Sequence, residues 1–165
     1  DQGATRERLR MITTRRVLSE SGAPAGTADF NVARDESEGT RKFISLTAPL
    51  IDVLQNGRVL VIDEFDARLH PILSRAIIEL FHSPVNRKNA QLIFATHDTN
   101  LLDRSLLRRD QIWFTEKDKF GSTDLYSLAQ FQVDEGANLE RDYIQGKYGA
   151  IPYLRPLQIP SGGQS

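Results

Sequence analysis

Two short apolar segments of this 165-residue chain end in side chains that bind metals or move protons. Val59–Ile62 is followed by Asp63 and Glu64, and residues 91–95 are followed by the triplet Thr-His-Asp at 96–98. An Asp at a strand end can hold Mg²⁺, which prefers a few carboxylate oxygens together with waters and phosphates. A neighbouring Glu can orient a water, and a neutral His can hydrogen-bond a phosphate oxygen or the attacking water. These residue types suit metal-assisted attack of water on a phosphate.

The segments before these residues are predicted to be strands of a parallel sheet. Continuous apolar runs rich in β-branched residues are typical of central strands whose two faces are both covered. A helix from Pro71 to about Phe81 is predicted between them. Neighbouring parallel strands end at the same sheet edge, where ligands bind, so we expect the two polar ends to share one crevice. Since side chains alternate along extended chain, Glu64 should point differently from Asp63.

An amphipathic helix is predicted before the first strand. Ser37 is a good N-cap, and Gly57 follows the last periodic residue, Asn56. Pro49 is expected to kink the helix. The apolar residues that recur at helical spacing are Phe43, Leu46, Leu50, Val53 and Leu54.

The flanking segments complete an α/β fold, in which a parallel sheet is covered by helices on both faces. Residues 5–32 are predicted to form a β-hairpin with a long Gly/Pro-rich turn, and residues 101–107 a short helical stretch. A third sheet strand at 111–115 leads into a C-terminal antiparallel hairpin with residues 123–128. We expect three regions: a hairpin or arm at 1–34, the main lobe at 35–130, and an extension at 131–165 whose end, from Pro160, is disordered.

Composition excludes several classes of protein. The 21 Lys and Arg nearly balance the 22 Asp and Glu, so the net charge is −1 and gives no global attraction to nucleic acid or anionic lipid. The absence of Cys excludes disulfides, a thiolate zinc site and a cysteine nucleophile. No apolar run approaches the ~20 residues that cross a bilayer, so we expect a cytoplasmic protein without membrane contact. For the five arginines from Arg6 to Arg16 two interpretations stay open: they contact phosphates of a nucleic acid, or they form a solvated face of a strand.

Four segments, in this order, resemble the motifs of ABC-type ATPases, including the structural-maintenance-of-chromosomes branch. Residues 36–40, Glu-Ser-Glu-Gly-Thr, stand where the LSGGQ-type signature begins a helix. Residues 59–64 resemble a Walker B strand with its catalytic Glu, residues 65–71 the D-loop, and residues 95–98 the switch-histidine loop.

Two further features are similar to bacterial defence ATPases. The Asp-Glu-x-x-x-x-Leu-His-Pro form of residues 63–71 resembles the branch of overcoming-lysogenization-defect and abortive-infection ATPases. Residues 110–114 and 145–152 resemble the C-terminal end of bacterial AAA-type ATPases associated with phage defence. The resemblance covers residues 35–154.

The resemblance implies a role for each matching residue. Asp63 would hold Mg²⁺, Glu64 would activate water, and His97 would sense the γ-phosphate. The start of the predicted helix would contact ATP held by the opposite subunit of a homodimer, because a helix start presents N–H groups and a positive dipole end to an anion. The resemblance also implies residues that bind the nucleotide. These are Ser37, Glu38 and Gly39 of the signature, and Asp66 and His70 of the D-loop.

The chain departs from the family pattern at three points. Glu38 replaces the commoner Gly of the signature, and Thr40 replaces its Gln. His70 stands where transporters carry the D-loop Asp, and more simply sets the turn into the next helix. No Gly-x-x-x-x-Gly-Lys-Ser/Thr motif occurs in the 165 residues, so the backbone cradle and lysine for ATP are lacking. The first hypothesis is therefore that the chain is the C-terminal lobe of a P-loop NTPase of the ABC type, and that its P-loop lobe lies in missing N-terminal sequence.

Two alternatives come from other classes of protein. In the second hypothesis the chain is a degenerate head that dimerises, or docks a nuclease or toxin subunit, without catalysis. In the third hypothesis the acidic residues and histidine near the strand ends form the metal site of a phosphodiesterase, with Asp63, Glu64, Asp66, His97 and Asp98 as ligands.

Overall fold

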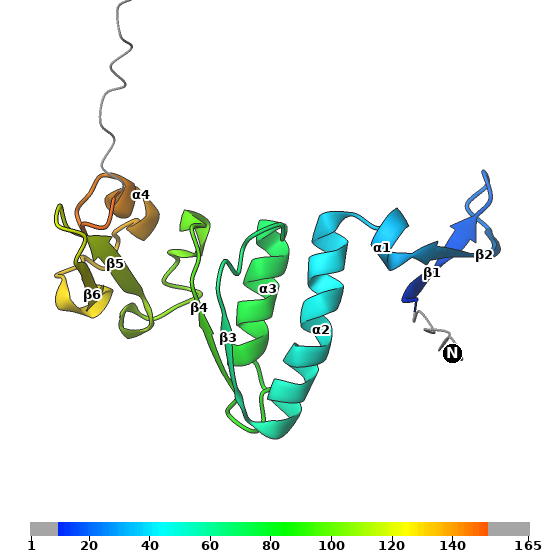
Figure 1. The fold of residues 1–165 in the computed structure, drawn as a ribbon, viewed down its shortest axis with the longest axis horizontal. Helices are drawn as coiled ribbons and strands as arrows, with labels where there is room; N and C mark the ends of the chain where they lie inside the picture. The colour runs from blue at the N-terminus through cyan, green and yellow to red at the C-terminus, as the bar shows by residue number, and fades with distance from the viewer. Residues whose placement is uncertain (1–9, 152–165) are drawn as a thin grey trace, which may run out of the picture. The chain divides into compact units, whose positions relative to one another are not determined.

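The computed structural model describes residues 10–151, which form two compact units that divide between Asp98 and Thr99 (Figure 1). The tail that we expect to be disordered, from Pro160, lies outside the described residues, as do the first arginines of the 6–16 segment. Among the described helices, none has both the length and the apolar character needed to cross a membrane.

The first unit begins with the expected β-hairpin. Strand β1 (Ile12–Leu18) pairs antiparallel with β2 (Pro24–Asn31), from Ile12 opposite Asn31 to Leu18 opposite Pro24. A one-turn helix, α1 (Val32–Asp35), follows directly.

One buried carboxylate connects the hairpin to the segment that precedes the next helix. Glu36 is only 6% exposed, accepts a hydrogen bond from the Thr13 hydroxyl at 2.5 Å, and forms an ion pair with Arg15. These hydrogen bonds hold the pKa of Glu36 below its usual value, the Thr13 hydroxyl contributing most. Arg15 therefore has a partner within its own chain.

Helix α2 (Glu38–Asn56) has the ends that its sequence predicts. The Ser37 hydroxyl caps the first turn by accepting a hydrogen bond from the Thr40 N–H at 3.1 Å. Gly57 ends the helix in the left-handed region at φ +66°, and its N–H donates to the Val53 carbonyl. Leu50 and Val53 are the buried residues of this helix.

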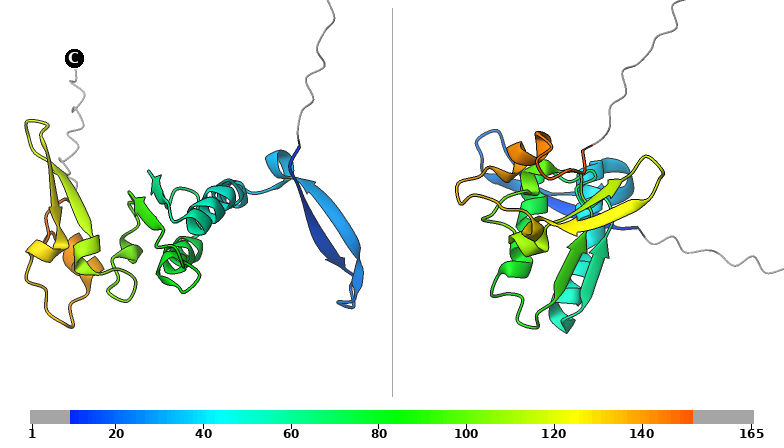
Figure 2. Two further views of the ribbon diagram at one scale, coloured as in Figure 1. Left: turned by 90° about the horizontal axis from the view of Figure 1, so that it is seen from below. Right: turned by 90° about the vertical axis from the view of Figure 1, so that its left-hand side faces the viewer.

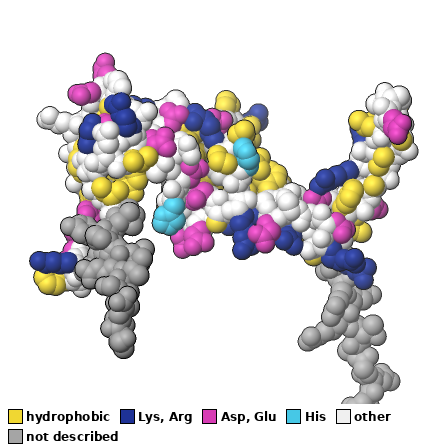
Figure 3. Space-filling model, turned by 90° about the horizontal axis from the view of Figure 1, so that it is seen from above, with side chains coloured by type: hydrophobic (Ala, Val, Ile, Leu, Met, Phe, Trp, Pro, Cys, Tyr) yellow, Lys and Arg dark blue, Asp and Glu magenta, His cyan; other side chains and the backbone are white. Residues whose placement is uncertain are grey.

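A parallel strand pair follows. Strands β3 (Val59–Ile62) and β4 (Gln91–Phe94) pair in register, and α3 (Pro71–His82) connects them. Helices α2 and α3 lie on the same side of the pair (Figure 2). Figure 3 views the molecule from the end at which both strands finish, and acidic, basic and histidine side chains gather there.

One face of this strand pair is uncovered in the described structure. Val59, Val61 and Ile93 are 53%, 70% and 55% exposed, whereas the alternate residues are buried or half-buried. Within the described part of the first unit, helices therefore cover one face of the strand pair, and not both faces as we expected. The reason is that α2 and α3, its two long helices, both lie on the same face.

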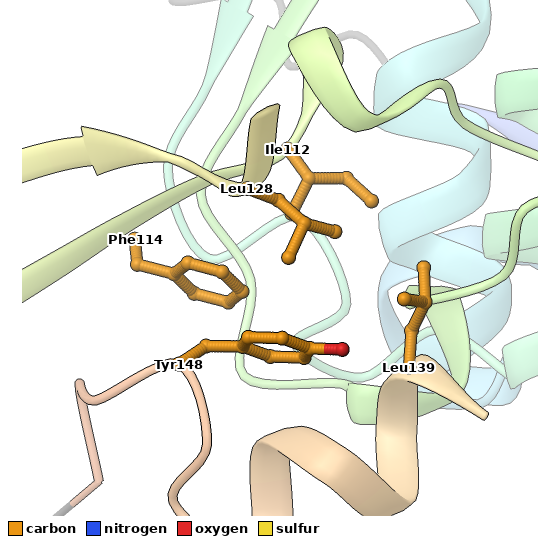
Figure 4. Packing of buried hydrophobic residues seen from close by; sticks show 5 residues of the cluster. All are labelled: Ile112, Phe114, Leu128, Leu139 and Tyr148. Carbon is orange, nitrogen blue, oxygen red and sulfur yellow. The ribbon is translucent and has the colours of Figure 1, made fainter. Parts of the chain in front are cut away.

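The second unit has its own core. Strand β5 (Trp113–Lys117) pairs antiparallel with β6 (Thr123–Ser127), and helix α4 (Leu139–Ile144) follows. Figure 4 shows the buried cluster that joins them. Its members are Ile112, Phe114, Leu128, Leu139 and Tyr148.

Three expectations for this unit need correction. The strand begins at Trp113 and not at residue 111, because Arg109–Gln111 forms a 3-10 turn. Within the described residues β5 pairs with β6 alone, so it does not extend the parallel sheet. The helical stretch expected at 101–107 is a 3-10 turn at Thr99–Leu101 followed by irregular chain.

Candidate functional site

The carboxyl ends of β3 and β4 are joined by backbone hydrogen bonds. Ile62 lies opposite Phe94, so the residues after them leave the sheet at one edge, as expected. The Ala95 N–H donates to the Ile62 carbonyl at 3.0 Å, and the Phe65 N–H donates to the Ala95 carbonyl at 2.9 Å. The two loops that carry the predicted site residues are therefore connected directly.

Phe65 anchors the loop that follows β3. Its side chain is completely buried, and its ring centroid lies 4.8 Å from that of Phe94 on β4. Burying an aromatic side chain of this size contributes about 2–3 kcal/mol. The neighbouring acidic residues are thus held on a fixed piece of backbone.

Asp63 and Glu64 are both exposed at this edge. The Asp63 Oδ1 accepts a hydrogen bond from the Glu64 N–H at 3.0 Å. Glu64 lies in the left-handed region at φ +48°, so the extended alternation that we expected to separate the two side chains stops at Asp63. The turn of the backbone at Glu64, and not strand alternation, redirects its side chain.

The Asp66 carboxylate joins the two loops. Its Oδ1 accepts hydrogen bonds from the Thr96 hydroxyl at 2.6 Å and from the His97 N–H at 3.3 Å. Burial is the largest single influence and raises the pKa of Asp66, but the hydrogen bonds from Thr96 and from backbone N–H groups together outweigh it and lower the pKa. The His97 residue itself is exposed.

The start of α2 contacts the same loop. A Cβ atom at Gly39 would lie 2.8 Å from the Arg68 carbonyl oxygen, so the two backbones approach closely. The Glu38 carboxylate pairs with Arg68 at 3.4 Å and with Arg41 at 3.8 Å. The negative charge that departs from the signature pattern is therefore compensated by two arginines. A shallow hollow beside it is lined by Glu38, Arg41, Lys42, Ser45 and Arg68.

Two predicted binding residues serve as helix caps. The Ser37 hydroxyl caps α2 and also lies 2.8 Å from the Thr40 hydroxyl. His70 caps α3, because its Nδ1 accepts a hydrogen bond from the Ile72 N–H at 3.3 Å. Pro71 follows at the first helical position, as expected.

The residues present fit a single-carboxylate magnesium site better than a multi-ligand one. Within residues 10–151, no three His, Asp or Glu side chains are grouped so that they could hold a metal ion. The five-residue phosphodiesterase site therefore has no support in the described structure. Asp63 is an exposed carboxylate at a strand end, and Mg²⁺ takes its remaining ligands from waters and phosphates.

The loop at 64–70 thus contacts both other predicted segments, through Asp66 to the His97 loop and through Arg68 to the start of α2. Sequence reasoning missed Thr96 and Arg68. Thr96 stood beside the predicted histidine, and its hydroxyl was the available signal. Arg68 had none, because its backbone contact with Gly39 and its ion pair with Glu38 both join residues that are distant in the sequence.

A comparison with protein families identifies a family for this chain. A protein-family model described as "AAA domain, putative AbiEii toxin, Type IV TA system" matches residues 20–103. The matched span contains α2, β3, α3 and β4 and every residue predicted for the site. A search of curated proteins finds no match.

Proposed function

The chain belongs to the AAA domain family that this match defines, and on that premise we propose that residues 35–130 are the C-terminal lobe of an ABC-type head that binds and hydrolyses ATP. A P-loop lobe outside this chain would complete the nucleotide site. The observation that carries the proposal is that the loop at 64–70 contacts both the start of α2 and the His97 loop. In the resemblance these three segments are the D-loop, the signature and the switch-histidine loop.

The uncovered face of the strand pair supports a missing lobe. Parallel strands are normally buried on both faces, and contiguous exposed apolar surface marks an interaction site. Val59, Val61 and Ile93 are more than half exposed on one face of β3 and β4. We infer that the P-loop lobe covers this face in the intact protein.

Each exposed residue at the strand ends has a proposed role. Mg²⁺, when bound, would neutralise charge on the phosphate oxygens, and Asp63 would hold it. Glu64 would orient the attacking water and accept its proton, and His97 would hydrogen-bond an oxygen of the γ-phosphate.

The start of α2 would act on the ATP of a second subunit. Its first turn presents backbone N–H groups and a positive dipole end, which favour a phosphate. Gly39 has no side chain that would stand between these N–H groups and a phosphate. The Glu38 carboxylate forms ion pairs with Arg41 and Arg68, which offset its repulsion of a phosphate. Two heads would then enclose two ATP molecules in a homodimer. From the family we infer that hydrolysis drives an abortive-infection, anti-phage or DNA-processing effector.

Replacing the proposed base tests this function. In the intact protein, Glu64→Gln should lower kcat for ATP by about 10²–10⁴-fold, because the amide cannot accept the proton of the water. ATP should then accumulate in a stable dimer, measured by light scattering with Mg²⁺ and ATP. Glu20→Gln, at an exposed hairpin position, is the matched control and should leave turnover unchanged. Undiminished turnover in Glu64→Gln would contradict the assignment.

A second candidate is a non-catalytic module that docks a nuclease or toxin subunit. It is favoured by the Ser37 hydroxyl, which already caps α2 and so has less capacity for a phosphate. Calorimetric titration of the intact protein with ATP, with and without Mg²⁺, separates the two functions. Mg²⁺-dependent binding supports the ATPase, and no binding supports the docking module.

A further inference from the structure

Three hydrogen bonds centre on Asp66 and Thr96. One carboxylate oxygen, Oδ1 of Asp66, accepts both the Thr96 hydroxyl and the His97 N–H. The same hydroxyl accepts the Asp98 N–H at 3.0 Å. Because it donates in one direction and accepts from another, its orientation is defined. The carboxylate therefore holds the turn that carries His97 at two consecutive residues.

The backbone that presents Asp66 is itself fixed. Phe65 before it is completely buried, and Leu69 after it is 8% exposed. The Leu69 N–H donates to the Asp66 carbonyl at 3.0 Å. Asp66 thus offers a rigid acceptor, whereas the exposed His97 residue depends on its backbone for its position.

We propose that Asp66 is a positioning residue, which holds the His97 imidazole in place through the Thr96 hydroxyl and the His97 N–H. The proposal rests on the ATPase function proposed above, and it assigns Asp66 a role different from the nucleotide contact that the family resemblance implies. A displacement of about 1 Å at a catalytic group can cost about 10²-fold in rate, so this hydrogen-bonded connection has a measurable effect on turnover.

The test uses two substitutions at Thr96. Thr96→Val has a similar shape but lacks the hydroxyl, whereas Thr96→Ser keeps it. In the intact protein, Thr96→Val should lower kcat about 10- to 100-fold with the KM for ATP changed less than about threefold, and Thr96→Ser should restore most of the loss. Thr123→Val, at an exposed position of β6, is the control for the same chemical change and should leave both constants unchanged.

A double substitution separates positioning from general support of the fold. In a His97→Ala background, Thr96→Val should cause no further loss of kcat, because the residue that it positions is gone. An equal loss in both backgrounds would overturn the proposal, as would full activity of Thr96→Val alone.

A measurement without nucleotide distinguishes failure of this proposal from failure of the ATPase assignment. In the present chain, amide hydrogen exchange of His97 should speed up at least about tenfold in Thr96→Val and in Asp66→Ala, but not in Thr96→Ser. If exchange is accelerated in the variants of the present chain but the intact protein does not hydrolyse ATP, only the ATPase function is overturned. Unchanged exchange would overturn the role of Asp66, whatever the turnover.

Discussion

At the scale of single residues, the start of α2 depends on a glycine. Gly39 has an ordinary helical backbone, so its importance is one of space. The Arg68 carbonyl oxygen occupies the position that a side chain would need, at 2.8 Å from a Cβ atom. Since that oxygen belongs to backbone, it cannot move aside as the end of a flexible side chain would.

Gly39→Ala should therefore destabilise the chain although it improves helix propensity. Alanine gains up to about 1 kcal/mol over glycine in a helix, but overpacking against fixed atoms costs about 1–3 kcal/mol. We expect a net loss of about 1 kcal/mol in the free energy of unfolding, measured with urea. Gly136→Ala, where a Cβ atom would meet nothing within 4 Å, should change it by less than about 0.5 kcal/mol. A stabilised Gly39→Ala would show that the two backbones separate easily.

At the scale of elements, the histidine before α3 acts as a helix cap. His70→Ala should cost about 1 kcal/mol of stability, because the Ile72 N–H loses its acceptor, whereas His70→Ser supplies another and should cost less than about 0.5 kcal/mol. Urea unfolding measures both changes. In the intact protein, His70→Ser should keep its ATP turnover. Loss of turnover at unchanged stability would instead place His70 at the nucleotide.

Element ends were predictable where their signals are local. Ser37, Gly57 and Pro71 each mark a helix end by their own chemistry, and the structure confirms all three. The short helix α4 was missed, because six residues give too little periodicity to detect. Its N-cap, Asn138, which accepts a hydrogen bond from the Arg141 N–H, was the available signal.

In the candidate site, too, some features could be predicted from the sequence and others could not. Parallel strands must end at one edge, so the adjacency of the 63–66 and 95–98 loops could be derived from the sequence. The hydrogen bond between Asp66 and Thr96 could not, because it joins side chains 30 residues apart whose meeting depends on the folded loop. The left-handed backbone at Glu64 was also hidden, since glutamate does not favour it.

At the scale of the whole molecule, the described chain presents an apolar surface that a finished parallel sheet would bury. Val61, the most exposed of its residues, lies at the middle of β3. In this chain it should behave as a surface residue. In an intact head, according to the proposed function, it should behave as a core residue.

Val61→Thr should therefore have different effects in the two proteins. In the present chain we expect a change below about 0.5 kcal/mol in the free energy of unfolding, as for most surface substitutions. In the intact protein the loss should reach about 1–3 kcal/mol, because a hydroxyl would be buried without a partner. Val17→Thr in the hairpin, 41% exposed, should be nearly neutral in both. An equally small effect of Val61→Thr in both proteins would show that nothing covers this face.

At position 64, the backbone conformation and the proposed catalytic role favour different side chains. Its left-handed conformation costs about 1–2 kcal/mol for a residue with a side chain, and glycine would relieve that cost. Screening this chain for thermal stability alone would therefore favour losing the carboxylate, whereas screening for turnover would retain it. Position 64 is thus one where a more stable protein and a more active protein call for different amino acids.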